Sequence, residues 1–242
     1  MLVWNEFEIG PIRPPSEGGS HSLLLRFTRN CPWSRCDFCF AAPYGRAKFQ
    51  LRSASEIKED IDTAKKIYDL IKTTSLKLGL GGEINQEVVD AIFRTYAEAR
   101  SSQSFVMVFN WLYFGGSSVF LQDADTLLMR TPDLAEAIQY LKKTFPSVKR
   151  ITSYARAKTA SRKSPGELES LKEAGLSRLH LGLETGDDEL LNRIHKGVGS
   201  EEQIRAGKNI VKAGIELSEY IMPGLGGKEM TRPSMQRTPH EC

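Results

Sequence analysis

Three of the chain's four cysteines lie in the stretch "NCPWSRCDFC" at residues 30–39, which is compact enough for one metal centre. Four residues separate Cys31 from Cys36, and two separate Cys36 from Cys39; the fourth cysteine, Cys242, ends the chain. Thiolates at such spacings bind zinc ions or iron–sulfur clusters. A chain of 242 residues can bury a core without disulfides. The spacing therefore predicts a metal centre in a reducing compartment.

The number of available ligands separates the two kinds of metal centre. A structural zinc ion takes four protein ligands. The nearest histidine, His21, precedes the strand expected at residues 22–28, and seven extended residues at about 3.3 Å each put it roughly 20 Å from the cysteines. A [4Fe–4S] cluster on three thiolates keeps one iron open, as catalytic zinc sites keep an open position. A zinc-stabilised binding module and a plain iron–sulfur electron carrier stay as alternatives.

Strand-like runs followed by capped amphipathic helices recur along the chain and predict parallel, right-handed βα units. The first strand, at residues 22–28, runs directly into the cysteine loop and precedes a helix from about residue 53. Thr131 and Ser164 have the spacing of caps followed by proline, and Ser164/Glu167 and Ser200/Gln203 have that of capping boxes. The later strands are expected near residues 119, 149, 177 and 215.

This pattern predicts an α/β fold, a partial (β/α) TIM-like barrel of about five parallel βα units. We expect a leader at 1–21, a core at 22–227 and an irregular tail at 228–242. The core contains an irregular insert at 73–116, in which residues 85–100 are a likely helix. Function is expected at the carboxyl ends of the strands, where the cysteine loop lies. The apolar run at residues 105–114 is expected to pack the insert onto the barrel.

Taken together, these features resemble the radical S-adenosylmethionine (SAM) enzymes. The resemblance rests on a cysteine loop after the first strand, on Phe38 before the third cysteine, and on "GLETGDDELLNRIHKG" and "MPGLGG" after the fourth and fifth strands. It covers roughly residues 22–227. The first gap between cysteines has four residues, where the commonest family spacing has three. "GLETG" favours the branch of the elongator catalytic subunit and the oxygen-independent coproporphyrinogen oxidase.

The resemblance implies that Cys31, Cys36 and Cys39 hold a [4Fe–4S] cluster whose fourth iron is chelated by SAM. In the family, an electron cleaves SAM to methionine and a 5′-deoxyadenosyl radical, which abstracts hydrogen from the substrate. The implied partners are a reductant, such as flavodoxin or ferredoxin, and an unknown substrate, which could be a small molecule, a peptide or an RNA. The family barrel has six strands, so we expect this chain to be a truncated version of a longer enzyme.

Two stretches compete for the family motif that binds the SAM amino group. Gly81 to Glu83 match the Gly-Gly-Glu sequence that this motif often has. The strand-like segments that follow them, however, interrupt the regular series of βα units. We favour Gln122, Asp123 and Asp125, because an ammonium group needs acceptors and these residues follow a strand directly.

The other SAM contacts are expected on later strands. His180, Gly182 and Glu184 should face the barrel interior, on the side of the strand opposite its leucines. The resemblance implies that Glu184 accepts hydrogen bonds from the SAM ribose, whereas His180 is expected to pack in the core. Arg156 and Lys196 are candidates for the SAM carboxylate. The cofactor-binding residues implied by the resemblance are completed by Phe38 and by Pro223 and Gly224 of "MPGLGG".

Composition limits the remaining function classes. The net charge is +3 and 40% of residues are hydrophobic, which fits one globular domain. The N-terminus lacks the basic and apolar stretches of a secretory signal, and the longest apolar run is too short to span a bilayer. We therefore expect a cytoplasmic protein without a membrane partner.

Overall fold

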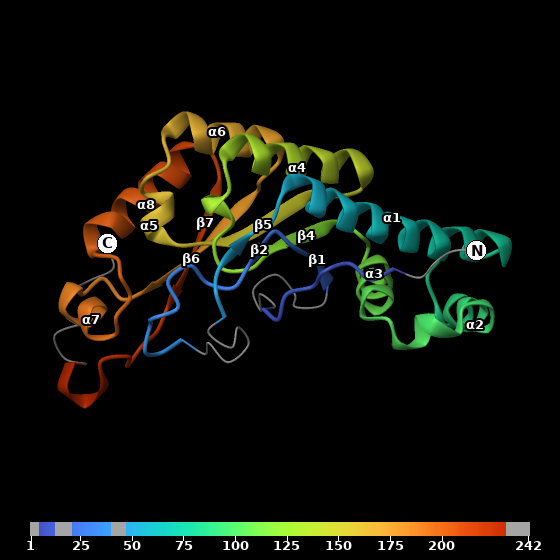
Figure 1. Cartoon of the computed structure of the whole chain (residues 1–242), viewed down its shortest axis with the longest axis horizontal. Helices are drawn as coiled ribbons and strands as arrows, with labels where there is room; N and C mark the ends of the chain where they lie inside the picture. The colour runs from blue at the N-terminus through green and yellow to red at the C-terminus, as the bar shows by residue number, and fades with distance from the viewer. Residues whose placement is uncertain (1–4, 13–20, 40–46, 231–242) are drawn as a thin grey trace.

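A five-stranded parallel sheet forms the centre of the structure, a computed structural model that describes residues 5–12, 21–39 and 47–230. The strand order is β1-β4-β5-β6-β7, so each of these strands lies beside its predecessor (Figure 1). This confirms the predicted series of parallel units, and the sheet is open within the described residues. The bounds are β1 (Leu23–Arg26), β4 (Ser118–Gln122), β5 (Arg150–Ala155), β6 (Arg178–Glu184) and β7 (Glu216–Ile221).

Four helices cover one face of the sheet, as Figure 1 shows. Each follows a strand and returns the chain toward the amino ends of the strands, which is the geometry of right-handed βα crossovers. The cysteine loop follows the carboxyl end of β1, and residues 5–12 lie beside this strand, where the Arg26 amide donates to the Glu8 carbonyl at 3.3 Å. The covering helices are α1 (Ala54–Lys77), α4 (Thr131–Thr144), α6 (Pro165–Ala174) and α8 (Ser200–Lys212).

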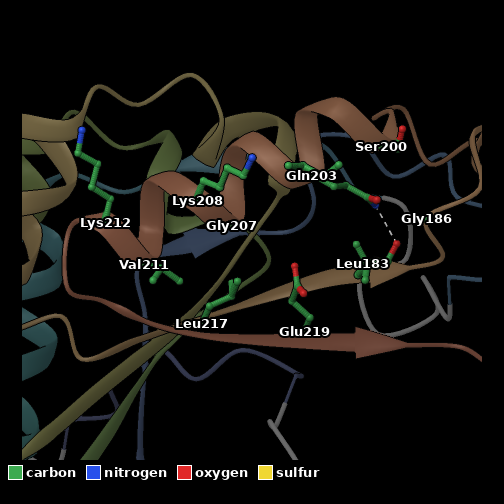
Figure 2. A pocket seen from close by; sticks show the side chains of 11 residues that line it. Leu183, Gly186, Ser200, Gln203, Gly207, Lys208, Val211, Lys212, Leu217 and Glu219 are labelled. Carbon is green, nitrogen blue, oxygen red and sulfur yellow. Dashed lines mark hydrogen bonds between the residues drawn. The ribbon is translucent and has the colours of Figure 1, made fainter. Parts of the chain in front are cut away.

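At the β7 edge, a groove of about 580 Å³ opens between α8 and the last two strands (Figure 2). Leu183, Val211 and Leu217 supply apolar surface, and Gln203 Nε2 donates a hydrogen bond to the Leu183 carbonyl at 2.8 Å. The groove lies on the helix-covered side of the sheet. It is thus separate from the cysteine loop.

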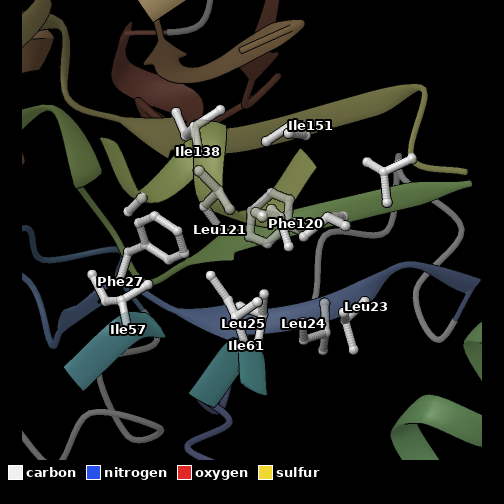
Figure 3. Close-up of a cluster of buried hydrophobic side chains, with 14 of the residues drawn as sticks. Leu23, Leu24, Leu25, Phe27, Ile57, Ile61, Phe120, Leu121, Ile138 and Ile151 are labelled. Atoms are coloured by element: carbon white, nitrogen blue, oxygen red, sulfur yellow. The ribbon is translucent and has the colours of Figure 1, made fainter. Parts of the chain in front are cut away.

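The core lies between the sheet and these helices. Leu23, Leu24 and Leu25 are all buried, and both α1 and α3 (Gln103–Tyr113) pack against this strand. Because successive side chains of a strand point to opposite faces, both faces of the first strand are covered. Figure 3 shows Ile57 and Ile61 of α1 beside this strand. Burial on both sides explains why the strand reads as a continuous apolar run.

The predicted irregular insert is helical. The first helix continues to Lys77, and α2 (Gln86–Thr95), the 3₁₀ helix η4 (Ala97–Ser101) and α3 (Gln103–Tyr113) follow. The apolar run is α3, whose Trp111 is buried with its ring centroid 5.2 Å from that of Phe145. The helix expected at residues 85–100 is confirmed by α2, while the expectation of irregular structure in the rest of the insert was wrong. The expected packing role of the apolar run agrees with its burial.

Helix starts agree with the sequence in part. Ser53 and Ser164 are N-caps with complete capping boxes. Thr131 is instead the first helical residue, and its hydroxyl donates to Glu167. In the last helix Gly199 is the N-cap, one residue before the predicted Ser200.

The short elements lie close to the cysteine loop. An antiparallel pair of strands, β2 (Thr28–Arg29) and β3 (Gln50–Leu51), flanks it, and the sequence did not predict this pair. The remaining elements follow the carboxyl ends of the strands: the 3₁₀ helix η5 (Thr126–Leu128), α5 (Ala157–Ala160) and α7 (Asp188–Arg193).

The expected leader and tail are described only in part. Residues 5–12 pack beside the sheet, where Phe7 N donates to Ser104 Oγ at 2.9 Å. Residues 227–230 form a helical turn, and Cys242 lies outside the described residues. None of the helices in the described ranges combines the length and apolar character needed to cross a membrane.

Candidate functional site

The three clustered cysteines lie in a bent loop at the carboxyl end of β1. Cys31, Cys36 and Cys39 are partly buried and form no disulfide. The bends come from Asn30 and Ser34, whose φ angles of 67° and 49° lie in the left-handed region. The Ser34 amide donates to Cys31 Sγ at 3.4 Å. The bent backbone therefore keeps all three thiols partly exposed.

These thiols line a cavity of about 470 Å³. The carboxyl ends of β5, β6 and β7 supply its other walls, which is the expected place for a site on a parallel sheet. Predicted site residues that line it with the cysteines are Phe38, Arg156, Glu184 and Lys196. Apolar and aromatic residues complete the lining: Ile12, Ala124, Tyr154, Ala155, Ala157, Val198, Tyr220, Ile221 and Met222, with Lys158 and Gly182.

A nearly buried ion pair lies in this cavity. Lys196 Nζ is 2.7 Å from Glu184 Oε1, and the side chains are only 13% and 8% exposed. The pair lies above Gly182, where an added Cβ would be 2.3 Å from the Glu184 oxygen and 2.8 Å from the ammonium. Glycine at position 182 therefore makes room for the two charges.

The predicted alternation along β6 is confirmed. Leu179 and Leu181 are buried in the core, while Gly182 and Glu184 line the cavity. His180 is fully buried, with its ring centroid 5.7 Å from that of Tyr154, in agreement with the expected core role.

The charges around Cys36 act in opposite directions on its thiol. Burial raises the pKa of Cys36, and the positive charge of Lys196 opposes this rise. The neighbouring Cys39 raises the pKa further, and Arg156 lowers it. Two cations thus face the thiols and offset part of the effect of burial, although the pKa of Cys36 stays raised.

The donor set fits a cluster better than one zinc ion. Within the described ranges, no three His, Cys, Asp or Glu side chains are grouped closely enough to hold a single metal ion. A zinc ion needs ligands at about 2.0–2.3 Å from one point. In a [4Fe–4S] cluster the thiolates bind different irons, so three cysteines around a shared cavity suit it.

Three predicted SAM contacts do not face the cavity. The Gln122 amide accepts from Gly10 N and donates to the carbonyl of Ile12. Asp125 is fully buried and accepts from Thr159 Oγ1 at 2.6 Å. The strand end turns these acceptors inward, and only Ala124 of this segment lines the cavity.

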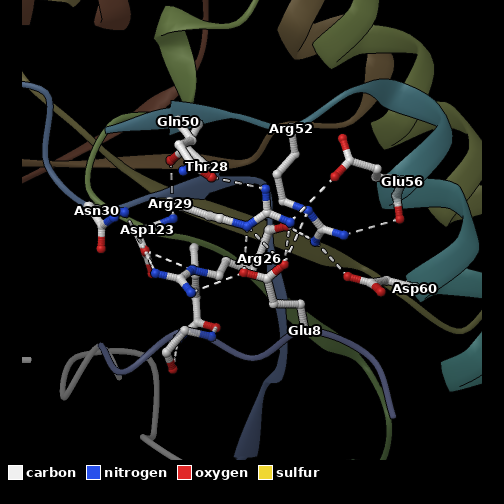
Figure 4. Close-up of polar contacts among 12 residues, drawn as sticks. Glu8, Arg26, Thr28, Arg29, Asn30, Gln50, Arg52, Glu56, Asp60 and Asp123 are labelled. Atoms are coloured by element: carbon white, nitrogen blue, oxygen red, sulfur yellow. Dashed lines mark hydrogen bonds and ion pairs between the residues drawn. The ribbon is translucent and has the colours of Figure 1, made fainter. Parts of the chain in front are cut away.

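Asp123 instead holds the start of the cysteine loop. Its Oδ2 accepts from Arg26 at 2.6 Å and from the Asn30 amide at 2.9 Å (Figure 4). Burial raises the pKa of Asp123, and these hydrogen bonds oppose the rise. Asp123 therefore holds the backbone of Asn30, the residue just before Cys31, in place. This role could not be read from the sequence.

An arginine cluster surrounds Glu8 beneath the same loop (Figure 4). Glu8 accepts from Arg26 at 3.0 Å and from Arg29 at 2.6 Å, and Arg52 Nε lies 3.5 Å from Glu8 Oε2. Burial raises the pKa of Glu8, but the Arg29 hydrogen bond and the three positive charges outweigh it, so the pKa is lowered. The cluster ties the N-terminal segment to β1 and β2.

The competing glycine stretch lies elsewhere. Gly81 and Gly82 are in the loop between α1 and α2, at the amino ends of the strands (Figure 1). They do not line the cavity. Pro223 and Gly224 directly follow the lining residue Met222, whose amide donates to the Glu184 carbonyl at 3.0 Å.

The sequence did not single out several residues of the site. Tyr154 and Tyr220 line the cavity with their hydroxyl oxygens 3.3 Å apart. Lys158 lines it too, and Trp33 lies on the cysteine loop. The interior alternation of β5 includes Tyr154 and could have indicated it. No sequence signal reveals Trp33, because its neighbours are distant along the chain.

Residues 25–232 match the family model described as the radical SAM superfamily, which is well over half of the chain. The chain belongs to the radical SAM superfamily. Members of this superfamily are enzymes that use a [4Fe–4S] cluster and SAM, and the residues of the cavity fit both. No curated protein matches the chain by sequence.

Two solved structures support the radical SAM fold. They are of the cobalamin-dependent SAM radical enzyme OxsB, with aqua-cobalamin bound and with both aqua-cobalamin and SAM bound. Their identities are 17% and 18%, and their TM-scores are 0.51 and 0.50. Each match covers 88% of this chain and 26% of the other, so this chain spans about a quarter of their length.

An archaeal Elp3 from Methanocaldococcus infernus, lacking its N-terminus, is also similar. Its TM-score is 0.40 at 16% identity, over 49% of this chain and 32% of that one. A likeness of this size does not test the expected branch.

Proposed function

We propose that this chain binds a [4Fe–4S] cluster and SAM in the cavity and uses them to abstract hydrogen from an organic substrate. Bound there, the two would supply reductive cleavage of SAM to methionine and a 5′-deoxyadenosyl radical. The observation that carries the proposal is the shared cavity, where the three clustered cysteines meet Glu184, Lys196 and Arg156.

Cys31, Cys36 and Cys39 would hold the cluster. Lys196 and Arg156 face the thiols with positive charge, which offsets the negative charge of three thiolates. Each cation also has an oxygen partner, so its position is fixed before a ligand enters. Such preorganisation lowers the cost of binding.

The same cations and Glu184 would hold SAM. The carboxylate of Glu184 can accept hydrogen bonds from ribose hydroxyls. The guanidinium of Arg156 can grip the SAM carboxylate in a bidentate fork. Phe38 and the turn with Pro223 and Gly224 would lie beside the remaining parts of the cofactor. The buried acids after β4 are left out of this set, because neither of them lines the cavity.

The aromatic and apolar walls would protect a reactive species from water. Tyr154, Tyr220, Ile221 and Met222 form much of this lining. Exclusion of water prevents side reactions of reactive intermediates. A one-electron reductant such as flavodoxin or ferredoxin would serve as partner, and the substrate class stays open among small molecules, peptides and RNA.

An anaerobic reconstitution tests the proposal. The purified chain is loaded with iron and sulfide, reduced with dithionite, given SAM and assayed for 5′-deoxyadenosine by chromatography. We expect product in the wild type and none in Cys36→Ala. Iron binding without product would favour the electron carrier, and a colourless protein holding zinc would favour the binding module.

A further inference from the structure

We infer that the turn at residues 194–197, which follows α7, positions the cysteine loop, and that Trp33 is its main positioning residue. The inference rests on the proposed function of this loop as the cluster site. It assigns a part to residues that lie outside the metal-ligand set. The argument depends on contacts between two segments about 160 residues apart in the chain.

Three polar contacts join the loop to the turn. The Trp33 indole Nε1 donates to the His195 carbonyl at 2.7 Å. The Asp37 amide donates to the Ile194 carbonyl at 3.1 Å. His195 Nδ1 also lies 2.9 Å from Asp37 Oδ2. The residues between the first and third cysteines are therefore fixed to the turn at two positions.

The shape of the turn depends on left-handed backbone. His195 and Gly197 have φ angles of 52° and 71°. A Cβ on Gly197 would lie 2.3 Å from the Trp33 ring, closer than two carbon atoms can approach without a shift. Only glycine combines this backbone conformation with such close contact to the indole.

The end of β5 holds the turn from the other side. Arg156 donates to the Lys196 carbonyl at 3.2 Å, and its guanidinium carbon lies 5.2 Å from the Trp33 ring centroid. Lys158 Nζ donates to the Gly197 carbonyl at 3.3 Å. The indole is thus packed between the turn and a cation that itself holds the turn.

The turn also connects the cysteine loop with the proposed SAM contacts. Lys196 belongs to the turn, pairs with Glu184 at 2.7 Å and lies 5.2 Å from the centroid of the Phe38 ring. A ligand that engages this ammonium therefore acts on the segment that fixes Trp33 and Asp37. We expect SAM binding and the order of the cysteine loop to be coupled, each strengthening the other.

A matched pair of glycine variants tests the inference in the metal-free protein. Gly197→Ala places a Cβ 2.3 Å from the indole ring of Trp33. Gly79 has a φ of 76°, close to the 71° of Gly197, but a Cβ added there has nothing within 4 Å. Hydrogen–deuterium exchange is measured for peptides covering residues 31–39. We expect at least about tenfold faster exchange of the Asp37 amide in Gly197→Ala alone, because the hydrogen bond to Ile194 opens.

A second variant tests the same contact if Gly197→Ala fails to fold. Trp33→Phe keeps an aromatic ring and removes the donor to His195. After reconstitution, we expect normal iron content, about fivefold to tenfold weaker SAM binding by equilibrium dialysis, and a reduced effect of SAM on the electron paramagnetic resonance spectrum of the reduced cluster. Trp33→Ala should show the larger loss.

The outcomes separate this inference from the proposed function. If the wild type binds no iron–sulfur cluster, the proposed function fails. If it binds the cluster but Gly197→Ala exchanges like Gly79→Ala and Trp33→Phe binds SAM like the wild type, the positioning part is overturned alone. Faster exchange in the metal-free Gly197→Ala and weaker SAM binding in Trp33→Phe would support it.

Discussion

Lys196 and Glu184 form an ion pair of 2.7 Å in the cavity that the three clustered cysteines line. The glutamate ends β6 with a φ of 62°, and the lysine comes from the turn after α7. Two charges so little exposed stabilise each other only while both are present.

Replacement of Lys196 by methionine should therefore destabilise the metal-free protein. It leaves the Glu184 carboxylate buried without its cation, and we expect a loss of about 1–3 kcal/mol in the free energy of unfolding, measured with urea. The double variant Lys196→Met/Glu184→Gln should recover much of that loss. If the double variant is as unstable as the sum of both single variants, the pair is not coupled.

The cysteines of the loop should differ sharply from the terminal cysteine in iron binding. The wild type should bind about four irons per chain after anaerobic reconstitution, as a [4Fe–4S] cluster requires. Cys39→Ser should bind far fewer. Cys242→Ser should bind as many as the wild type. Equal iron content in the two variants, measured by colorimetric assay, would contradict the assignment of ligands.

Asp123→Asn should act on stability, because this side chain holds Arg26 and the Asn30 amide. We expect a loss of about 1–3 kcal/mol in the free energy of unfolding, since the charge-assisted hydrogen bonds are weakened. SAM binding by the reconstituted, folded fraction should change less than threefold. A large loss of SAM affinity at unchanged stability would instead support direct contact with the SAM ammonium.

The buried Asp125 should give the free energy of unfolding an unusual pH dependence. Burial raises its pKa to about 6, so between about pH 4 and pH 6 the folded state holds a proton that the unfolded state releases. The contribution of Asp125 to the free energy of unfolding must then fall as the pH rises through this range, by roughly 3 kcal/mol. Urea unfolding of the metal-free protein measures it.

Asp125→Asn provides the comparison for this pH dependence. As the pH rises from 4 to 7, the variant should become progressively more stable relative to the wild type. Glu167→Gln serves as a control of opposite sign, because hydrogen bonds from Ser164, Thr131 and Lys163 lower the pKa of Glu167 to about 2. The contribution of Glu167 is present above pH 4.5 and is lost as the pH falls toward 2. A constant difference between Asp125→Asn and wild type would rule out the raised pKa.

Much of the fold could be predicted from the sequence because its signals are local. The period of apolar residues changes between strand and helix, and Ser164 with Glu167 marks a helix start within four residues. Within the insert, the helix near residues 85–100 was predicted, but the apolar run was not predicted to be helical. The reason is that α3 is apolar on most of its surface and has weak amphipathic periodicity. Its neighbours α1 and Phe145, which cover it, are far away in the chain.

The sequence alone was enough to predict three clustered cysteines as metal ligands and to place one wall of the site. The thiols are close in the chain, and strand alternation alone places Gly182 and Glu184 on one face. Only the tertiary structure decided that Gln122, Asp123 and Asp125 turn away from the cavity. It likewise decided that the 194–197 turn meets Trp33. Such contacts depend on how separate βα units pack together, and neither periodicity nor spacing along the chain encodes which side chains then meet.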